Sequence, residues 1–573
     1  TKQDAFRAKL SFDLSETFNV ELGYNYTRAE DGRGVQFSVI ENVERFFLQN
    51  GGATRPMELG ETANDPVPGT DNQPTVAARQ NEFYMKLRLD TGIGEIRSVT
   101  GYAENKIDTN FDFDGSYIPA VYGVNGINDE ILQQSVDWNI DAISNVDLTI
   151  GGQYIQLKTD TFYDSWAGGP YLSRPYDPTQ TPTLASQAIT SRTESYRTKE
   201  AWAAFIDATV NFGPAALTLG GRYSQETQDM AAYKFGFGGI GGPVVYSPAT
   251  GADKSSKYKK FTPRATIRFE LAPRTSVYAS YTKGFRSGEW NGNIPNDNPV
   301  NWKDVKPETI DAFEVGIKGA GSRFSFDAAA FYYDYKNLQV SSVVVNPDNS
   351  VTPVLQNAPK AKIKGVEANF TYEVTDNFNI RAGGTYLHAR YGKGFIFDGV
   401  GVSNDPNYGA ATCGNGVAAQ QGNCGGVGIN ANSDPLKTYY NVSGPQDISG
   451  LQMARAPDWE AYFSADYTIP IGEGGITLAG NVKYKDDYVV SNPSVWGIGA
   501  GVPLDRQREQ RFVEDAQVLV NASLTYRDPS DTFYVRVFGT NLTDKRYKMH
   551  YNGTTTFGTY APLAEPRTYG VTL

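Results

Sequence analysis

Histidine is nearly absent from this chain, with 2 copies among 573 residues. Zinc binding, haem ligation and acid–base catalysis near neutral pH all rely on the imidazole nitrogen, so its scarcity weighs against all three. Glycine-rich phosphate loops at a strand–helix junction and nucleophile elbows are also missing from the sequence. These absences predict a protein that is not an enzyme, with no catalytic residues, no cofactor and no bound metal.

Positive charge is in deficit as well, because 52 Lys and Arg are outnumbered by 64 Asp and Glu, for a formal net charge of −12. Nucleic-acid binding needs clustered cations, so that class is excluded. The chain has no run of about eighteen apolar residues, which excludes a transmembrane helix but not a spanning β-strand of about ten residues, half of them polar. Residues 1–13 lack the basic start and apolar centre of a signal peptide, which indicates a mature product or a fragment.

Tyrosine and glycine are abundant instead, with 36 and 59 copies. From Phe18 to Tyr26 large apolar residues alternate strictly with polar ones, and the same period of two recurs near 148–154, 217–223 and 518–526. Each run reaches a tyrosine about six to eight residues after a short polar turn. At about 3.3 Å per residue and a tilt near 40°, this separation covers most of an apolar band about 25 Å tall, as in the aromatic girdle of a membrane barrel.

The connections between these runs alternate between short ones, such as 90–92 and 272–274, and long ones, such as 31–79 and 395–450. Up-and-down strands give this alternation when one end of a barrel faces the periplasm and the other faces outside. We therefore predict an all-β, transmembrane, antiparallel up-and-down β-barrel with about nineteen strands, between the size of porins and that of plugged transporters. The strands are expected near 5–13, 18–28, 81–90, 94–106, 129–140, 146–159, 197–211, 215–229, 257–270, 275–284, 309–318, 323–340, 361–374, 378–391, 459–468, 475–487, 515–527, 533–541 and 567–573.

Seven phrases follow one another in the second half of the chain. They are VYASYTKGFRSG at 277–288, VKPET at 305–309, FEVGIK at 313–318, FYYDY at 331–335, AKIKGVEA at 361–368, NLTDKRY at 541–547 and PRTYGV at 566–571. In this order they resemble the barrel of TonB-dependent outer-membrane receptors of the siderophore-receptor type. The first half of the chain is similar in architecture more than in wording.

The resemblance implies that residues 1–573 form the receptor β-barrel domain, integral to the bacterial outer membrane. The N-terminal plug, the TonB box and about three first strands of an expected 22 would be absent, and the C-terminal end slightly truncated. The implied function is active uptake of a scarce extracellular solute, most of all a ferric siderophore, with energy supplied by TonB. The implied partners are the plug of the same polypeptide, the TonB complex, outer-membrane lipid and lipopolysaccharide, and an iron chelate. A passive porin-like channel, a surface adhesin or lectin, and a receptor for glycans or cobalamin remain alternatives.

Two groups of candidate site residues follow from this assignment. Charged residues on the expected inward face would line the lumen and contact the plug, or less directly a ligand; they are Arg222, Glu314, Lys318, Glu367, Arg381, Lys483 and Arg536. Aromatic residues in the long connections could stack on a ligand, with ordinary loop packing as the alternative. The ligand-binding candidates are Trp166, Tyr176, Trp290, Trp302 and Trp496, together with Arg286.

Cys413 and Cys424 are the only cysteines, and both lie in the connection at 395–450. In an oxidising compartment neither has another partner, so we expect a disulfide between them. Metal binding by two thiols without a nearby histidine is disfavoured.

Overall fold

The computed structural model describes residues 2–31, 38–41, 75–112, 121–168, 187–236, 250–291, 304–345, 351–403, 440–491, 512–530, 532–549, 552–554, 558–561 and 564–573. These ranges contain strands and turns and no helix, and hence no helix that is long and apolar enough to cross a membrane. The period-two runs of the sequence are therefore realised as β-structure wherever the chain is described.

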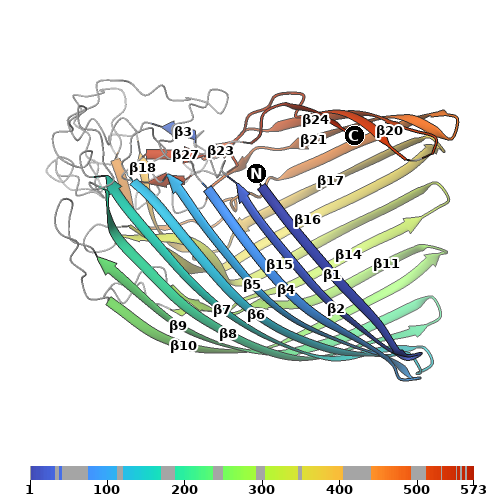
Figure 1. The fold of residues 1–573 in the computed structure, drawn as a ribbon, viewed down its shortest axis with the longest axis horizontal. Helices are drawn as coiled ribbons and strands as arrows, with labels where there is room; N and C mark the ends of the chain where they lie inside the picture. Colours follow the sequence, from blue (N-terminus) through green and yellow to red (C-terminus); the bar gives the residue numbers. More distant parts are fainter. Residues whose placement is uncertain are drawn as a thin grey trace.

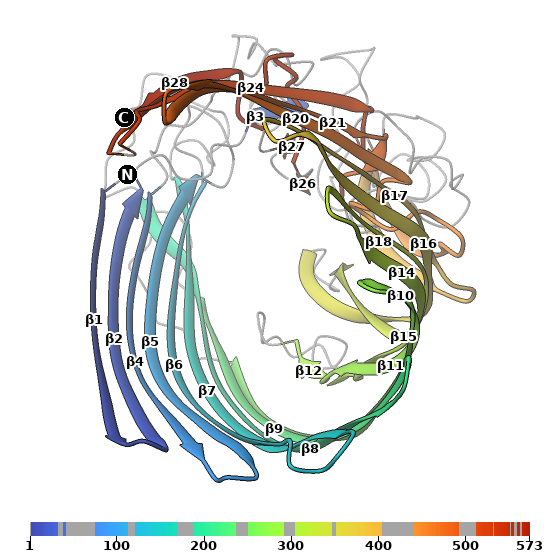
Figure 2. The same cartoon turned by 90° about the vertical axis from the view of Figure 1, so that its right-hand side faces the viewer.

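Nineteen strands form one antiparallel sheet that curls round on itself as a barrel wall (Figures 1 and 2). Each strand pairs with the next one of the series along the chain. The series is β1 (Lys2–Ser15), β2 (Phe18–Asp31), β4 (Thr75–Asp90), β5 (Gly94–Asp112), β6 (Val121–Ile140), β7 (Val146–Gly168), β8 (Gln187–Phe212), β9 (Ala215–Gly236), β10 (Thr250–Ala272), β11 (Thr275–Arg286), β14 (Glu308–Ala320), β15 (Phe324–Val345), β16 (Val351–Thr375), β17 (Phe378–Tyr391), β20 (Trp459–Ile471), β21 (Gly474–Lys485), β24 (Gln517–Arg527), β25 (Tyr534–Thr540) and β28 (Thr568–Thr572).

The predicted fold class and the predicted count of nineteen strands are confirmed, but several predicted strand bounds are wrong at one end. The strand expected at 129–140 begins at Val121, and the one expected at 197–211 begins at Gln187. Alternation of apolar and polar residues is needed only where one face of a strand meets lipid. The added residues extend past that region, so the period-two signal stops before the strand does.

The two ends of the barrel differ in the length of the connections between strands. Turns such as the one between Ser15 and Phe18 and the one between Phe212 and Ala215 gather at the end that is on the right in Figure 1, which we call the short-turn end. At the opposite end the chain passes through longer connections, for example from Asp31 of β2 to Thr75 of β4. We call this the long-loop end.

Apolar side chains share one face of the sheet. In β1 the exposed Phe6, Leu10 and Leu14 alternate with Arg7 and Lys9, and the register places Leu10 opposite Leu22 of β2. The same face carries Val315 of β14, 56% exposed, and Leu478 of β21, 57% exposed. A continuous belt of exposed apolar side chains is what a barrel presents to lipid, so this is the outer face and the charged face lines the interior.

Aromatic rings on the inner face lie over glycines of the neighbouring strand. Tyr84 of β4 is paired with Gly23 of β2, and a Cβ at Gly23 would meet the Tyr84 ring at 2.0 Å. Phe205 covers Gly151 in the same way, with 2.3 Å to an added Cβ. The arrangement recurs with Tyr278 over Gly316 and Phe538 over Gly570. A side chain at any of these positions would displace the ring, because the ring occupies the space that the side chain would take.

A compact apolar core lies at the long-loop end, where residues of β15, β16 and β17 pack against residues that follow β17 and β21 in the chain. Its most buried side chains include Phe395, 1% exposed, and Phe512, 0% exposed. The Phe395 ring lies 5.5 Å from that of Tyr391. The remaining members are Val340, Ala358, Ile448, Tyr488, Val489, Val490 and Val513. This loop-end core joins segments that are distant in sequence.

Four small sheets of short strands lie at the long-loop end, within the described residues. They are β12 (Glu289–Trp290) with β13 (Asp304–Val305), β18 (Ile396–Ser403) with β19 (Tyr440–Asp447), β22 (Tyr488–Val489) with β23 (Val513–Glu514), and β27 (Gly558–Ala561) with β26 (Asn552–Thr554) and β3 (Ser38–Glu41). The sequence analysis did not predict them, because two to eight residues are too few for a reliable period.

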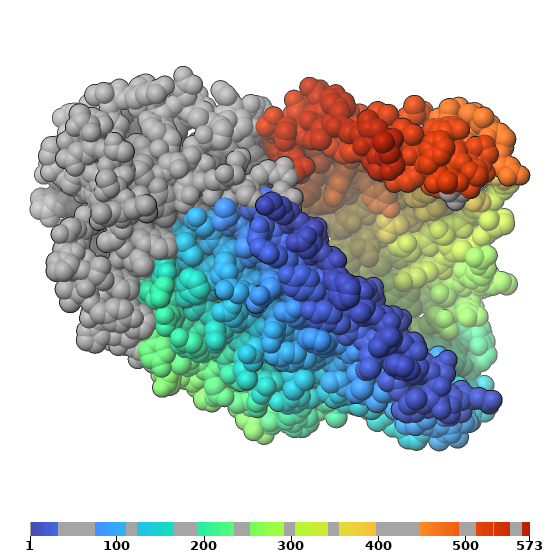
Figure 3. Space-filling model, in the orientation of Figure 1, coloured from blue at the N-terminus to red at the C-terminus, as the bar shows by residue number. Residues whose placement is uncertain are grey.

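The sheet is open between its first and last strands. Within the described residues β1 pairs only with β2, and β28 pairs only with β25. Both strands run from the long-loop end to the short-turn end, so they are parallel to each other. Figure 3 shows their edges diverging toward the short-turn end, with the far wall visible between them.

Candidate functional site

A short segment folds onto the inner face of the barrel directly after β11. It consists of residues 287–291 and 304–308, which include the paired strands β12 and β13, and we call it the strap. In Figure 2, β12 lies inside the ring of the barrel wall. The strap begins in the phrase GFRSG and ends in VKPE, the wording that carried the family resemblance. The sequence therefore marks this segment but does not say where it lies.

Side chains of β9 and β10 hold one side of the strap. Gln228, 2% exposed, donates its amide to the Gly288 carbonyl at 2.8 Å, and the Ser287 hydroxyl donates to Glu226 Oε1 at 2.7 Å. The Tyr258 hydroxyl donates to Asp304 Oδ1 at 2.9 Å. Gln228 and Tyr258, which are both buried, thereby have hydrogen-bond partners.

Gly288 allows the close approach that these contacts require. A Cβ at this position would lie 2.1 Å from the Val305 carbonyl oxygen and 2.8 Å from the Tyr258 ring. The first of these neighbours is backbone and cannot rotate away. Any side chain at residue 288 would therefore push the two halves of the strap apart.

The other side of the strap is bound to β15 and β16. Asn357 accepts a hydrogen bond from the Lys306 amide at 2.8 Å and donates to the Lys306 carbonyl at 2.9 Å. Gln339 donates to the Ser287 carbonyl at 2.8 Å. Asn291 exchanges two hydrogen bonds with the Leu355 backbone, at 2.9 and 2.6 Å. The strap is thus fixed to the wall from both flanks.

Cations gather where the strap leaves the wall. Glu289 is shared between Arg197 of β8, at 3.3 Å, and Arg286, at 3.6 Å. Lys199, two residues from Arg197 on the same inward face, has no hydrogen bond or ion pair within the described part of the chain. The Arg286 side chain is 60% exposed. This corner of the lumen therefore brings three cations together beside the carboxylates of Glu289, Glu226 and Glu308.

Trp290 is held at the strap rather than displayed above the barrel. Its indole N–H donates to Ser256 Oγ of β10 at 2.6 Å, and the Lys254 ammonium lies 5.6 Å from the centre of its ring. One edge of the ring system is thereby fixed while a cation covers a face.

The seven charged residues expected to line the lumen all lie on the inward face by register. Arg222 is opposite Phe205, Glu314 opposite Ser280, Lys318 opposite Ser276, Glu367 opposite Thr385, Arg381 opposite Ser464, Lys483 opposite Tyr462, and Arg536 opposite Thr525. Arg381 pairs with Asp466 at 2.6 Å, and Lys483 pairs with Glu460 at 3.3 Å. The register places these residues but does not test their contact with a plug or a ligand.

Three of those cations belong to a repeated three-layer arrangement. Arg222 lies 5.8 Å from the centre of the Phe205 ring, Lys318 lies 5.5 Å from that of Tyr278, and Arg536 lies 5.4 Å from that of Phe538. Each of these rings covers a glycine of the adjacent strand, and Lys86 over Tyr84, at 4.8 Å, is a fourth case. We call these glycine–ring–cation stacks. They hold the charges against the inner wall.

Other predicted residues lie where the structure gives no side-chain position. Trp166 belongs to β7, but its side chain is not described, and Tyr176, Trp302, Trp496, Cys413 and Cys424 lie outside the described residues. Within the described ranges no group of three or more His, Cys, Asp or Glu is arranged to hold a metal ion. The sequence analysis missed Arg197, Lys199, Gln228 and Glu289, which are ordinary polar positions until the strap is seen to fold against them.

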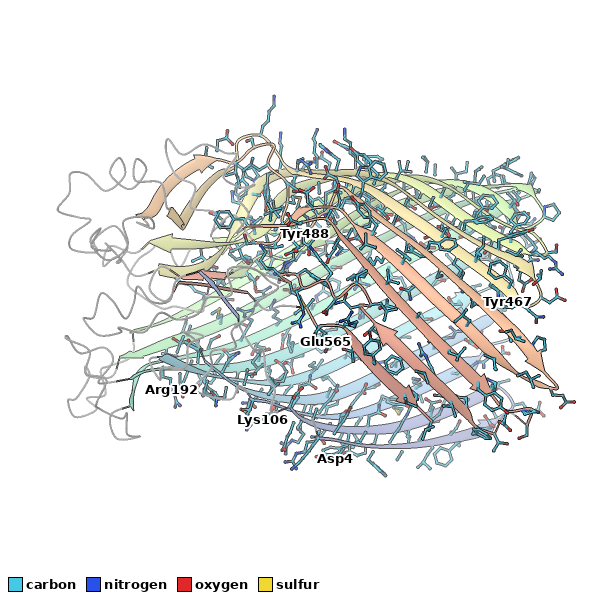
Figure 4. The ribbon with its side chains drawn as sticks, turned by 90° about the horizontal axis from the view of Figure 1, so that it is seen from above. Asp4, Lys106, Arg192, Tyr467, Tyr488 and Glu565 are labelled. Atoms are coloured by element: carbon cyan, nitrogen blue, oxygen red, sulfur yellow. The ribbon has the colours of Figure 1, made fainter. Side chains whose placement is uncertain are left out.

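Burial perturbs two titratable groups beside the loop-end core. Glu514, 5% exposed, accepts the Lys548 backbone N–H at 2.9 Å, and its burial raises the pKa of the carboxyl above the usual range. Burial raises the pKa of Tyr488 to about 12, with the Glu514 carboxylate adding to the effect. Figure 4 places Tyr488 toward the long-loop end and Tyr467 near the short-turn end.

Comparison with known proteins identifies the family to which the chain belongs. Residues 2–564 match the family described as TonB dependent receptor-like, beta-barrel. The ferric-pyoverdine M114 receptor PbuA of Pseudomonas sp. (strain M114) is 26% identical over 270 residues, 44% of this chain and 30% of the length of that relative. The chain therefore matches less than a third of that curated relative.

Solved structures give the same fold over nearly the whole chain. The ferric yersiniabactin uptake receptor FyuA from Yersinia pestis superposes with a TM-score of 0.66 at 14% identity, covering 99% of this chain and 70% of its own. The siderophore receptor PiuA from Acinetobacter baumannii gives 0.65 at 17% identity, with 99% and 73% covered.

Proposed function

Since this chain belongs to the TonB-dependent receptor-like β-barrel family and is integral to the outer membrane, we propose that it takes part in the uptake of a ferric siderophore. The observation that carries the proposal is the strap, which sets Arg197, Lys199 and Arg286 together at the long-loop end of the lumen and leaves the Arg286 side chain exposed. A ferric chelate is an anion when its deprotonated groups carry more than the three positive charges of the iron, and a partly desolvated group of cations favours such an anion over a neutral solute.

We propose further that uptake is driven by TonB acting on a plug domain held by the inner wall. The glycine–ring–cation stacks and pairs such as Arg381 with Asp466 would form the docking surface. Charges that cover an inner wall are stable beside either water or a polar partner, and a wide barrel without a plug would leak.

The open edge of the sheet supports a proposal about the whole barrel. β1 and β28 are parallel, so an antiparallel closure requires an odd number of strands between them. Three strands would satisfy that parity and give the 22 of plugged transporters. We propose that about three strands and the plug complete the receptor to which residues 1–573 contribute the barrel.

Iron-limited growth tests this function. A strain deleted for the receptor should grow more slowly than its parent on one or more ferric chelates of a panel, and removal of TonB should reproduce the defect. Uptake that survives loss of TonB would indicate a passive channel. No iron phenotype, with growth lost on an oligosaccharide or on cobalamin, would contradict the siderophore assignment.

A paired substitution tests the role of the strap cations. Lys199→Gln with Arg286→Gln should weaken binding of an anionic chelate about tenfold or more, because two partly desolvated charges are removed. Arg268→Gln is the matched control, since Arg268 is an inward-facing cation of β10 that lies near the short-turn end. Equal losses in the two proteins would exclude the strap as the binding site.

A further inference from the structure

Three polar side chains interrupt the apolar belt on the outer face of β5 and β6. Ser98 of β5 lies opposite Val136 of β6, which is 42% exposed. Thr100 lies between Met85 of β4, 36% exposed, and Gln134 of β6. Because alternate residues of a strand share a face, these three polar side chains point to the same side as their exposed apolar neighbours. We call Ser98, Thr100 and Gln134 the belt triad.

The belt triad lies well inside the belt and not at its rim. Thr100 is six residues from the first residue of β5, and Gln134 is six residues from the last residue of β6, both at the short-turn end. At about 3.3 Å per residue and a tilt near 40°, that is a height of about 15 Å within an apolar band about 25 Å tall. At comparable heights β8 and β14 carry Ile206 and Val315, which are 51% and 56% exposed.

Hydrogen bonds join the three side chains of the triad to one another. The Thr100 hydroxyl donates to Gln134 Oε1. The Gln134 amide donates to Ser98 Oγ at 2.9 Å and to the Ser135 carbonyl at 3.1 Å. Both amide hydrogens of Gln134 and the hydroxyl hydrogen of Thr100 are therefore in use.

Two hydrogen-bonding positions of the triad remain open. The Ser98 hydroxyl accepts from Gln134 but donates to no group in the described part of the chain, and Gln134 Oε1 uses one of its two lone pairs. Lipid tails supply neither an acceptor nor a donor, and an unmet polar group is costly in hydrocarbon. Each barrel thus presents to the lipid one open donor beside one open acceptor.

We propose that the belt triad is the centre of an interface between two copies of this chain in the membrane. A two-fold axis along the membrane normal keeps both copies at the same height and brings the same patch of each wall face to face. Each copy donates its Ser98 hydroxyl to Gln134 Oε1 of the other, so both open positions of both copies are filled. A different protein would need a matching acceptor and donor at this depth, whereas a second copy always carries them.

Apolar side chains around the triad would exclude lipid from this contact. Leu132 and Tyr102 lie opposite each other on one side of the triad, 38% and 37% exposed, and Val136 lies on the other side. A hydrogen bond between proteins in hydrocarbon is modest by itself, so packing of these side chains must contribute as well. The inference concerns the outer wall of the barrel and is independent of the transported solute, the plug and TonB.

The first test needs no variant. The full-length receptor carries one fluorophore on a terminal tag and is reconstituted in lipid vesicles at falling protein-to-lipid ratios, and the copies in each complex are counted by single-molecule photobleaching. Two-step bleaching should exceed chance co-occupancy of a vesicle and should decline on dilution as mass action requires. Two-step bleaching at the level of chance at every ratio would overturn the proposal.

Substitutions then test the triad itself. Gln134→Leu should weaken dimerisation about tenfold or more, because both reciprocal hydrogen bonds are lost, and Ser98→Ala should weaken it in the same direction. Both changes make the lipid-facing surface more apolar, so the heat resistance of the monomer should be retained. Gln133→Leu is the matched control, since Gln133 is the adjacent residue of β6 and faces the lumen opposite Gly101. Unchanged dimerisation of Gln134→Leu, or an equal loss in Gln133→Leu, would refute the triad as the contact.

Cross-linking identifies the occupant. In native membranes a short thiol cross-linker should join Val136→Cys receptors into a product of twice the receptor mass. Val315→Cys is the control, because Val315 faces lipid at a similar height on β14, and it should give no such product. Equal products from the two variants would indicate random collision, and a product of Val136→Cys with another protein would assign the surface to that protein; either result would overturn the proposal.

Discussion

Gly288→Ala should release the strap from the inner wall while leaving the barrel intact. The new Cβ would lie 2.1 Å from the Val305 carbonyl oxygen, against an ordinary contact of 3.4 Å or more, so the two halves of the strap must separate by about 1 Å. That movement puts three hydrogen bonds at risk: Gln228 to the Gly288 carbonyl, Ser287 to Glu226, and Tyr258 to Asp304.

The size of the effect follows from those bonds. A neutral hydrogen bond contributes about 1 kcal/mol and one to a carboxylate about 1.5–3 kcal/mol, so the three together hold the strap by about 4–7 kcal/mol. Because a tilted strap keeps part of this, we expect a loss of about 3 kcal/mol in the free energy of local opening. Amide exchange in the strap, residues 287–291 and 304–308, should then accelerate about a hundredfold.

Hydrogen exchange followed by mass spectrometry measures this directly. Gly152→Ala is the matched control, because a Cβ there meets nothing closer than the Ala203 carbonyl oxygen at 3.6 Å. Both variants should keep the heat resistance of the unsubstituted barrel. If the strap exchanges at the same rate in the two variants, or is already unprotected before substitution, the argument from close packing is wrong.

Three further substitutions probe the long-loop end. Phe395→Ala should destabilise the loop-end core by about 3–5 kcal/mol, because the ring is 1% exposed. We expect faster amide hydrogen exchange around Tyr391 with an unchanged melting temperature of the barrel, and a lowered melting temperature would contradict the prediction. The raised pKa of Glu514 means that its contribution to stability is present at low pH and is lost as the pH rises through the pKa of the folded state. Glu514→Gln should therefore protect the loop-end core from exchange, relative to the unsubstituted protein at the same pH, and this gain should be larger at pH 8 than at pH 5. Weaker protection of the loop-end core in that variant than in the unsubstituted protein at pH 8 would contradict this prediction. Cys413→Ser with Cys424→Ser should leave assembly and heat resistance intact, since closing so short a loop contributes about 3 kcal/mol at most, and two free thiols in the non-reduced protein would exclude the bond.

The strands could be predicted from the sequence because lipid imposes a simple rule on them. A residue such as Leu22 must face outward and Glu21 inward, and this alternation fixes both the strand and its face. The inward position of Arg222 follows from the same rule. The fold class, the count and the lumen-facing charges are therefore readable from local pattern alone.

The strap could not be predicted because nothing in a local pattern says where a connection returns. Trp290 lies in a segment without period, and the sequence analysis grouped it with aromatics of the loops. Its position depends on a hydrogen bond to Ser256, more than thirty residues earlier, and on the absence of a side chain at Gly288. Tertiary contacts of this kind leave only a trace in sequence, here the glycine of the phrase GFRSG.

The glycine–ring–cation stacks keep the inner surface of the barrel smooth, because their cationic side chains lie flat against the wall. Lys86, Arg222, Lys318 and Arg536 rest along ring faces instead of standing out into the channel, and each ring rests on bare backbone. Such a cation can slide from its ring to a passing carboxylate and back, exchanging one weak attraction for another without ever losing all its contacts. A charged domain in contact with this wall would then meet only low energy barriers to movement along it, because each new contact replaces one of similar strength.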